Sequence, residues 1–129
     1  MLLNLISDKF IPVISPIGVD SKGDSLNINA DIVASEIAAV LKCEKLIFMT
    51  DTDGVMKKNK LIPNVSIGEI SKLIKNQTIT GGMIPKIESA KLALKKNVKS
   101  AHIINGTTPH SLLLEVFTEK GIGTAITLK

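Results

Sequence analysis

Short apolar segments alternate with amphipathic helical segments along most of the chain, and this order restricts the fold more than any other feature of the sequence. Three segments have the length and composition of strands: residues 45–50, 100–104 and 123–128. Helical periodicity lies around them, at residues 29–42, 66–76, 81–97 and 109–117. The alternation predicts an α/β fold, a layered αβα sandwich with a mainly parallel sheet, whose ligands bind at the carboxyl ends of strands.

The remaining segments are predicted from local signals. Residues 2–10 resemble the end of a helix, residues 10–19 a buried strand with prolines near its ends, and residues 18–26 a small hairpin. A polar loop is expected over 51–65. The faces predicted to meet the core in the two longest helices consist of Val33, Ile37, Val40 and Leu41, and of Met83, Ile87, Ala90 and Leu94. With 129 residues and no linker-like stretch, the chain is expected to form one domain.

Composition argues against several functional classes. The net charge of +4 comes from sixteen scattered lysines without arginine, and only three Phe and no Tyr or Trp are present for stacking on bases, so a nucleic-acid partner is not expected. No apolar run is long enough to span a membrane. The single Cys43 excludes an internal disulfide, and no Cys/His cluster has metal-ligand spacing, so neither a zinc site nor any other protein-held metal is predicted.

The stretch NINAD places Asn27, Asn29 and Asp31 at the start of an apolar helix. Asn29 is suited to cap that helix, and a carboxylate at position 31 is favoured by the helix dipole. Capping does not account for Asn27. A ligand-binding turn, with free helix N–H groups available to an anion, is therefore the alternative interpretation.

The stretch TGGMIPKIE, residues 80–88, also begins a helix. Gly81 and Gly82 expose backbone amides, and Pro85 is tolerated in a first helical turn. Lys86 is unusual there because a cation opposes the positive end of the helix dipole, which indicates a nearby anion. Judged alone, the motif also fits a solvated surface lysine, and it is not a Walker loop.

The stretch IFMTDTDGV, residues 47–55, leads from an apolar strand into two aspartates. In a parallel sheet Asp51 would reach the ligand crevice, whereas Asp53-Gly54 is most simply a turn. The spacing does not match an EF-hand.

Together these motifs resemble the acetylglutamate kinases of the amino acid kinase family. The resemblance extends over PVISPIG, NINADIVASEIA, KLIFMTDTDGV, ITGGMIPKI, AHIING, PHSLLLEVF and GIGTAI, and so over the whole chain. It implies that residues 1–129 form the carboxyl-terminal, nucleotide-binding half of an amino acid kinase domain. The amino-terminal half would supply another lysine, a glycine-rich loop and a substrate-binding arginine.

The resemblance also implies roles for individual residues. Lys86 would stabilise the transferred phosphoryl group, Asp31 would organise the catalytic lysines, and Asn27, together with Asn29, would hold N-acetyl-L-glutamate. Mg-ATP would be the phosphoryl donor. The implied nucleotide-binding residues are Asp51, Thr52, Asp53, Gly54, Val55, Met56, Thr78, Ile79, Thr80, Gly81 and Gly82.

The carboxyl-terminal motif resembles the arginine-inhibited branch of the family, in which His102, Glu115 and Gly121 match effector-binding positions for L-arginine. Without the resemblance, a histidine on a strand such as His102 is more often a satisfied core histidine than a ligand, and Glu115 also fits a solvated residue of an apolar helix. Asn105 and Thr107 replace the acid and the arginine that are common in this family.

Alternatives to an acetylglutamate kinase are another amino acid kinase, favoured less because of Asn27, and a non-catalytic module that binds nucleotide or arginine. The resemblance further implies a homo-oligomer, a nitrogen-signalling regulatory protein as a partner, and a cytoplasmic or plastid location. The absent half predicts little or no turnover by this chain alone.

Overall fold

The computed structural model describes all 129 residues, and its centre is a four-stranded sheet. The strand order is β3 (Lys45–Thr50), β7 (Ser100–Asn105), β8 (Thr124–Thr127), β6 (Asn64–Ser66). Two of the three pairings are parallel, β3 with β7 and β6 with β8, whereas β7 and β8 are antiparallel. The predicted α/β class with a mainly parallel sheet is confirmed, and the sheet is mixed.

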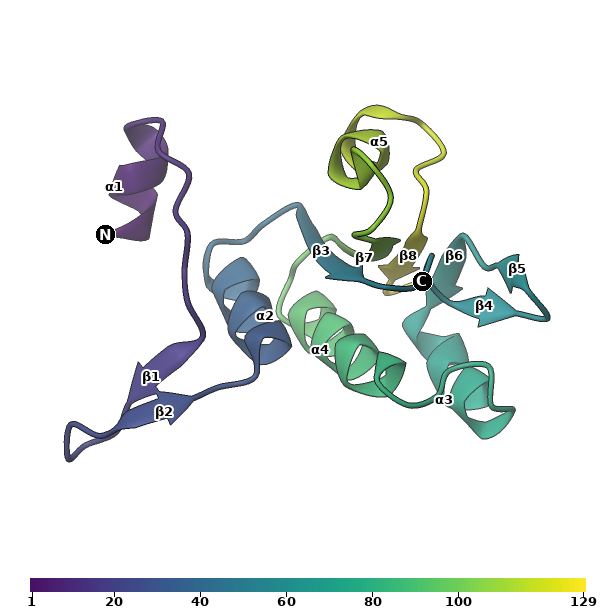
Figure 1. The fold of residues 1–129 in the computed structure, drawn as a ribbon, viewed down its shortest axis with the longest axis horizontal. Helices are drawn as coiled ribbons and strands as arrows, with labels where there is room; N and C mark the ends of the chain where they lie inside the picture. Colours follow the sequence, from purple (N-terminus) through teal and green to yellow (C-terminus); the bar gives the residue numbers. More distant parts are fainter.

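Helices cover both faces of this sheet (Figure 1). On one side lie α2 (Ala30–Val40), α3 (Ile67–Lys75) and α4 (Met83–Lys95), and on the other lies the short α5 (Ser111–Phe117). The central strand β7 is buried from Ala101 to Ile104 because α4 and α5 lie against its opposite faces. None of the helices combines the length and apolarity needed to cross a bilayer.

The antiparallel direction of β8 follows from how α5 is connected. Thr124 pairs with Ile103 and Ile126 with Ala101, so β8 begins near the end at which β7 finishes. The chain therefore leaves β7, forms α5 and returns at the same end of the sheet, without the full crossover that a parallel connection requires.

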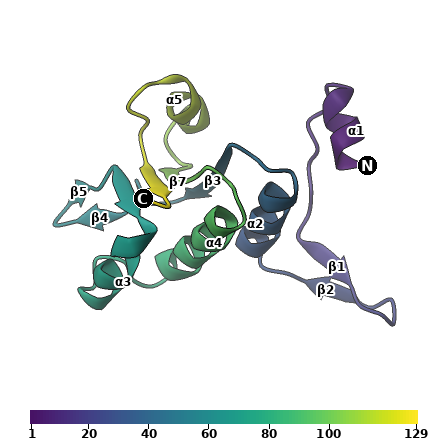
Figure 2. The same cartoon turned by 180° about the vertical axis from the view of Figure 1, so that it is seen from behind.

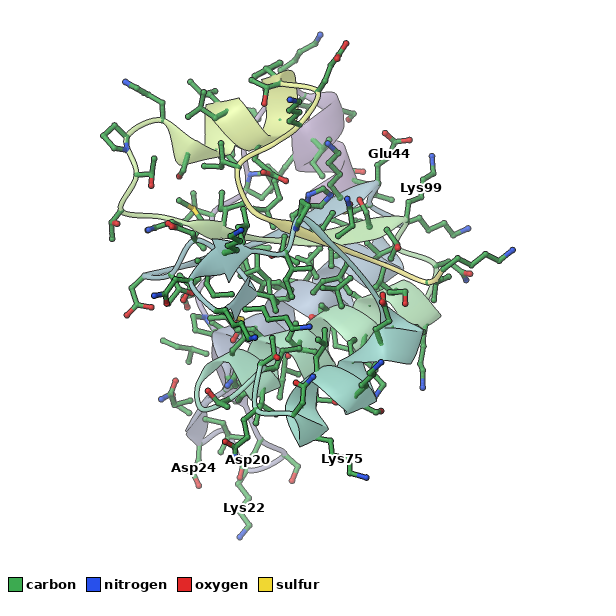
Figure 3. All side chains as sticks on the ribbon, turned by 90° about the vertical axis from the view of Figure 1, so that its right-hand side faces the viewer. Asp20, Lys22, Asp24, Glu44, Lys75 and Lys99 are labelled. Carbon is green, nitrogen blue, oxygen red and sulfur yellow. The ribbon has the colours of Figure 1, made fainter.

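Two short hairpins lie outside the central sheet. The predicted hairpin near residues 18–26 is confirmed as β1 (Ile17–Val19) and β2 (Ser25–Asn27), and at its projecting tip Asp20 accepts hydrogen bonds from the N–H groups of Lys22 and Asp24 (Figure 3). Within the stretch expected to be a polar loop, β4 (Met56–Lys57) pairs with β5 (Lys60–Leu61). Lys58 and Asn59 between them have φ values of 50° and 60°, as a two-residue hairpin turn requires. The loop prediction for residues 51–65 was therefore wrong in part.

The amino-terminal segment corrects a second prediction. Residues 2–7 form α1 (Leu2–Ser7), but residues 10–16 form no strand, and Ile11 and Val13 are 89% and 96% exposed. Pro12 and Pro16 lack the N–H donors that pairing needs, and no strand lies beside the segment. Figures 1 and 2 show α1 and the β1–β2 hairpin standing apart from the sheet and its helices.

The hydrophobic core lies between the sheet and the layer of α2, α3 and α4. The predicted face of α4 is confirmed, since Ile87, Ala90 and Leu94 are at most 1% exposed. The predicted face of α2 is wrong in part: Val40 is 79% exposed, whereas Ser35 and Ala38 are buried. The small side chains of α2 turn toward α4, so close helix packing rather than maximal hydrophobicity selects the buried face.

An ion pair on the surface connects the amino-terminal ends of β3 and β7. Glu44 precedes β3, Lys99 precedes β7, and their side chains lie 2.5 Å apart (Figure 3). Hydrogen bonding and charge from Lys99 lower the pKa of Glu44. Both side chains are more than two-thirds exposed, so this pair adds little to stability.

Candidate functional site

A pocket of about 560 Å³ opens beyond the carboxyl end of β3. It lies between the segment that leaves β3 and the start of α4, the position at which α/β sheets bind ligands. Its lining consists of Thr50, Asp51, Thr52, Gly54, Val55, Met56, Thr78, Thr80, Gly81, Gly82, Met83 and Lys86.

One wall of this pocket is the segment after β3, which is held against β8. The side chain of Thr124 accepts a hydrogen bond from Val55 N–H at 2.9 Å and donates one to the carbonyl of Ile62 at 2.7 Å. Gly54 has φ +139°, and a Cβ there would lie 2.6 Å from Thr124 Oγ1. Only glycine suits this backbone conformation and this close approach.

The opposite wall is the start of α4. Gly81 has φ +53°, and a Cβ at Gly81 or Gly82 would meet no atom within 4 Å, so the backbone faces open space. In the first turn of α4 the N–H groups of Met83 and Ile84 bond to the carbonyls of Thr80 and Gly81, and Pro85 has no N–H. The backbone N–H groups of Gly81 and Gly82, just before the helix, are the ones that this wall offers to an anion. This wall can therefore receive a phosphate.

Lys86 and Asp31 form an ion pair at the edge of the same pocket. Lys86 Nζ lies 3.0 Å from each carboxylate oxygen of Asp31, although 55 residues separate them in sequence. Both side chains are about one-fifth exposed, so the pair is partly desolvated but remains open to a ligand. The carboxylate offsets the unfavourable placement of a cation in the first turn of α4.

A buried hydroxyl aligns the two helices that carry this pair. Ser35 Oγ lies 2.8 Å from the Asp31 carbonyl and 2.9 Å from the Ser89 carbonyl, and so connects α2 to α4. Asn29 caps α2, since its side chain accepts a hydrogen bond from Asp31 N–H at 2.8 Å. The capping interpretation of Asn29 is confirmed.

Not every predicted site residue reaches the pocket. Asn27 is exposed on β2, and Asn29 lines a different hollow between α2 and α4, beside Pro85 and Glu88. Ile79 is buried in the core, and Asp53 points to the Asn105 side chain instead of lining the pocket. The other predicted nucleotide-binding residues all line it.

The second predicted site is also brought together by the fold. His102 on β7, Glu115 on α5 and Gly121 line one pocket of about 550 Å³, with Lys45 and Lys120 at its border. Glu115 is 5% exposed, so the expectation of a solvated residue was wrong, and His102 is 8% exposed.

The carboxylate of Glu115 already has internal partners. His102 Nδ1 lies 2.5 Å from Oε1, and Oε2 accepts hydrogen bonds from the N–H groups of Ile122 and Gly123. Burial raises the pKa of Glu115, but these hydrogen bonds and the nearby His102 outweigh it and leave the pKa below its ordinary value. Gly121 has φ +61°, and a Cβ there would lie 2.6 Å from Glu115.

Sequence reasoning missed three residues that position the first pocket. Ser35, Thr124 and Asn105 each act through contacts with residues more than fifty positions away. No local sequence motif predicts such contacts. In the sequence Asn105 stands out only because it replaces an acid that is common in the family.

Solved structures share this fold. Carbamate kinase from Giardia lamblia bound to AMP-PNP matches with a TM-score of 0.70 and 21% identity, over 98% of this chain and 43% of that chain. N-acetylglutamate synthase from Neisseria gonorrhoeae complexed with coenzyme A and L-arginine matches with a TM-score of 0.91 and 30% identity, over 99% of this chain and 30% of that chain. The fold is that of the amino acid kinase-like α/β sandwiches.

The family profile described as "Amino acid kinase family" matches residues 2–105, and the chain belongs to this family. It is 52% identical to acetylglutamate kinase from Aquifex aeolicus over 130 residues, which is 100% of this chain and 44% of that protein. It is 54% identical to acetylglutamate kinase from Methanocaldococcus jannaschii over 127 residues, which is 95% of this chain and 42% of that protein. The chain thus spans less than half the length of the curated relatives it matches.

Proposed function

We propose that this chain is the nucleotide-binding half of an acetylglutamate kinase. The whole enzyme would transfer the γ-phosphoryl group of Mg-ATP to the side-chain carboxylate of N-acetyl-L-glutamate, in arginine biosynthesis. The observation that carries the proposal is the Lys86–Asp31 pair at the edge of a pocket, beside the wall formed by the glycine-led start of α4. The identity of more than 50% to acetylglutamate kinases supports this acceptor over those of other amino acid kinases.

Phosphoryl transfer needs charge neutralisation and alignment more than covalent chemistry from the protein. As the bond from an acceptor carboxylate oxygen to the γ-phosphorus forms, the bond to the β,γ-bridging oxygen breaks and its electrons leave with ADP. The acceptor is already ionised at neutral pH and needs no base. Lys86 would stabilise the equatorial oxygens, and Asp31 would hold its ammonium group in position.

The nucleotide phosphates would lie against the open amides of Gly81 and Gly82, and the adenosine part against residues 51–56 and 78–80. Mg²⁺ would arrive with ATP as part of the substrate. Asp51 is the carboxylate that lines the pocket, and it would reach the metal or the ribose. Asn27 and Asn29 lie outside the pocket, so their proposed contact with acetylglutamate requires the substrate to approach from the hairpin side.

Titration calorimetry of the 129-residue chain with Mg-ADP tests the nucleotide part of this proposal. We expect a measurable heat of binding and a higher melting temperature, because a ligand that binds the folded state alone stabilises it. Absence of both, at Mg-ADP concentrations into the millimolar range, would contradict nucleotide binding.

A second role is proposed for the pocket of His102, Glu115 and Gly121, as an effector site for L-arginine. Its support is the likeness to the Neisseria gonorrhoeae synthase whose structure contains L-arginine. Because the Glu115 carboxylate already forms hydrogen bonds with His102 and with two backbone N–H groups, an arginine would have to share or displace these partners. Arginine-dependent stabilisation of the chain in thermal unfolding tests this role.

A further inference from the structure

The segment Asp51–Val55 lines the nucleotide pocket with four of its five residues, and the fifth, Asp53, faces away. Asp53 Oδ1 accepts a hydrogen bond from Asn105 Nδ2 at 2.9 Å. Asn105 is the last residue of β7 and pairs in register with Thr50, the last residue of β3. The contact therefore connects the carboxyl ends of two neighbouring strands on the outer side of the pocket.

The orientation of the Asn105 amide follows from its other contacts. Its Oδ1 accepts hydrogen bonds from Thr107 N–H at 2.9 Å and from Thr107 Oγ1 at 2.7 Å. A reversed amide would place its NH₂ group against the Thr107 N–H, where no hydrogen bond can form. The NH₂ group is thus directed to Asp53, and asparagine both accepts from its own turn and donates to the next segment.

The carboxyl end of the segment is held by Thr124, whose Oγ1 accepts a hydrogen bond from Val55 N–H. Between these two attachments lies Gly54, whose φ of +139° is accessible to a flexible glycine alone. The Thr124 contact lies on the carboxyl side of Gly54, whereas the Asp53 contact lies on the same side of Gly54 as Asp51 and Thr52. The β7 turn also lies close to it, since Gly106 N–H donates to the Thr50 carbonyl at 2.7 Å.

We propose that Asn105 is a positioning residue for nucleotide binding: its amide holds Asp53 and thereby fixes the pocket wall Asp51–Val55. This inference rests on the nucleotide-binding function proposed above. It also explains why an uncharged residue suits position 105 when an aspartate is present at position 53. An acid at both positions would place two carboxylates in hydrogen-bond contact, with no proton to share at neutral pH.

A four-variant cycle in the 129-residue chain tests the proposal: wild type, N105D, D53N and the double variant D53N/N105D. Aspartate at 105 still accepts from Thr107, so N105D changes only the side that faces Asp53. We expect N105D to weaken Mg-ADP binding about threefold to tenfold when Asp53 is present. In the D53N background, where the exchanged pair again forms a hydrogen bond, the same change should cost less than about twofold.

Hydrogen exchange at the amides of residues 52–55 provides a readout that needs no nucleotide. Exchange should quicken in N105D and return toward the D53N rate in the double variant, while melting temperatures report whether each variant is folded. An equal effect of N105D in both backgrounds, or no effect, would overturn the positioning role. If no variant binds Mg-ADP, the nucleotide-binding proposal fails, and the exchange cycle still decides whether Asn105 fixes the segment.

Discussion

The proposed role of Lys86 in phosphoryl transfer depends on its position at the start of α4 beside Asp31. In the first turn of α4 the helix dipole disfavours an ammonium group, and the carboxylate of Asp31 at 3.0 Å compensates for this. The pair is partly desolvated, so its electrostatic interaction with a bound phosphate is stronger than it would be in bulk water. Such a cation is useful mainly where negative charge accumulates during a reaction.

We expect Lys86→Ala to lower phosphoryl transfer far more than it weakens acetylglutamate binding. The assay is steady-state kinetics of a chimera in which this chain replaces the matching part of the Aquifex aeolicus enzyme. Loss of one charge-stabilising donor typically lowers kcat about 100-fold or more. The matched control is Lys91→Ala, which removes the partly exposed lysine paired with Glu88 on the same helix. Equal kcat in Lys86→Ala and Lys91→Ala would contradict the role.

Glu115 makes stability sensitive to acid. Because its pKa is lower in the folded protein than in the unfolded chain, its contribution to stability is complete above its ordinary pKa of about 4.5 and is lost as the pH falls through the lowered value. We expect the free energy of unfolding to fall below about pH 4.5, and Glu115→Gln to reduce that dependence.

At neutral pH the same Glu115→Gln change should destabilise the fold by about 2 kcal/mol, since charge-assisted hydrogen bonds to His102, Ile122 and Gly123 are weakened or lost. Glu119→Gln is the control, because Glu119 is exposed beyond the end of α5. Urea unfolding at several pH values measures both effects. Identical acid sensitivity in wild type and Glu115→Gln would refute this account.

At the scale of elements, the segment between β3 and β4 depends on one glycine. Gly54→Ala should lower the free energy of unfolding by about 2–4 kcal/mol and weaken Mg-ADP binding, because a Cβ would clash with Thr124 and φ +139° is strained for alanine.

Gly68→Ala provides the opposite case. Gly68 lies in α3, and the nearest atom to a Cβ there is Ser66 Oγ at 3.9 Å, so alanine should stabilise the helix by up to about 1 kcal/mol. Thermal and urea unfolding compare the two variants. Equal stability of both would show that the segment adapts to a side chain at position 54.

Repeating patterns and turn residues made most elements predictable from the sequence, including the β1–β2 hairpin, whereas β4, β5 and β6 were not predicted. Periodicity located β3, β7, β8, α2, α3 and α4, because each repeats its pattern over several residues. β6 has a single fully buried side chain, Val65, and β4 and β5 have two residues each, too few for any pattern. The strand prediction for residues 10–16 was wrong because an apolar sequence alone does not show whether a neighbouring strand is present to pair with it.

The candidate site was predictable where its residues belong to continuous motifs, and not where they act through contacts between distant parts of the chain. Residues 51–56 and 78–82 belong to continuous motifs, and the structure brings all but Asp53 and Ile79 to one pocket. Whether they bind nucleotide stays a prediction. The supporting contacts of Ser35, Thr124 and Asn105 join residues that are distant in sequence, and only the folded chain shows them.

At the scale of the whole molecule, the chain exposes many large apolar side chains in its first third. Phe10, Ile11 and Val13 are 64% or more exposed, and an apolar hollow of about 400 Å³ lies between residues 12–16, α2 and β3. β3 is an edge strand with no partner on its outer side. The central strands β7 and β8, in contrast, have a hydrogen-bonded strand on each side.

We expect the isolated chain to bind Mg-ADP but to show little or no acetylglutamate phosphorylation, whereas the Aquifex aeolicus chimera turns over. The reason is that the chain spans 44% of that relative and holds only part of the charge needed around a transferring phosphoryl group. A coupled assay of ADP release measures both proteins. Full turnover by the isolated chain would contradict the expectation that residues from the rest of the enzyme are needed for catalysis.

The hydrogen bond from Val55 N–H to Thr124 has a consequence for how the protein is made. Thr124 leaves the ribosome 69 residues after Val55, so α2, β3, α4 and β7 are all synthesised before the hydroxyl that secures the pocket wall is available. A nascent chain released before that point holds most of its core without a finished pocket. We therefore expect Mg-ADP to protect chains that stop before Thr124 from proteolysis less than it protects residues 1–129.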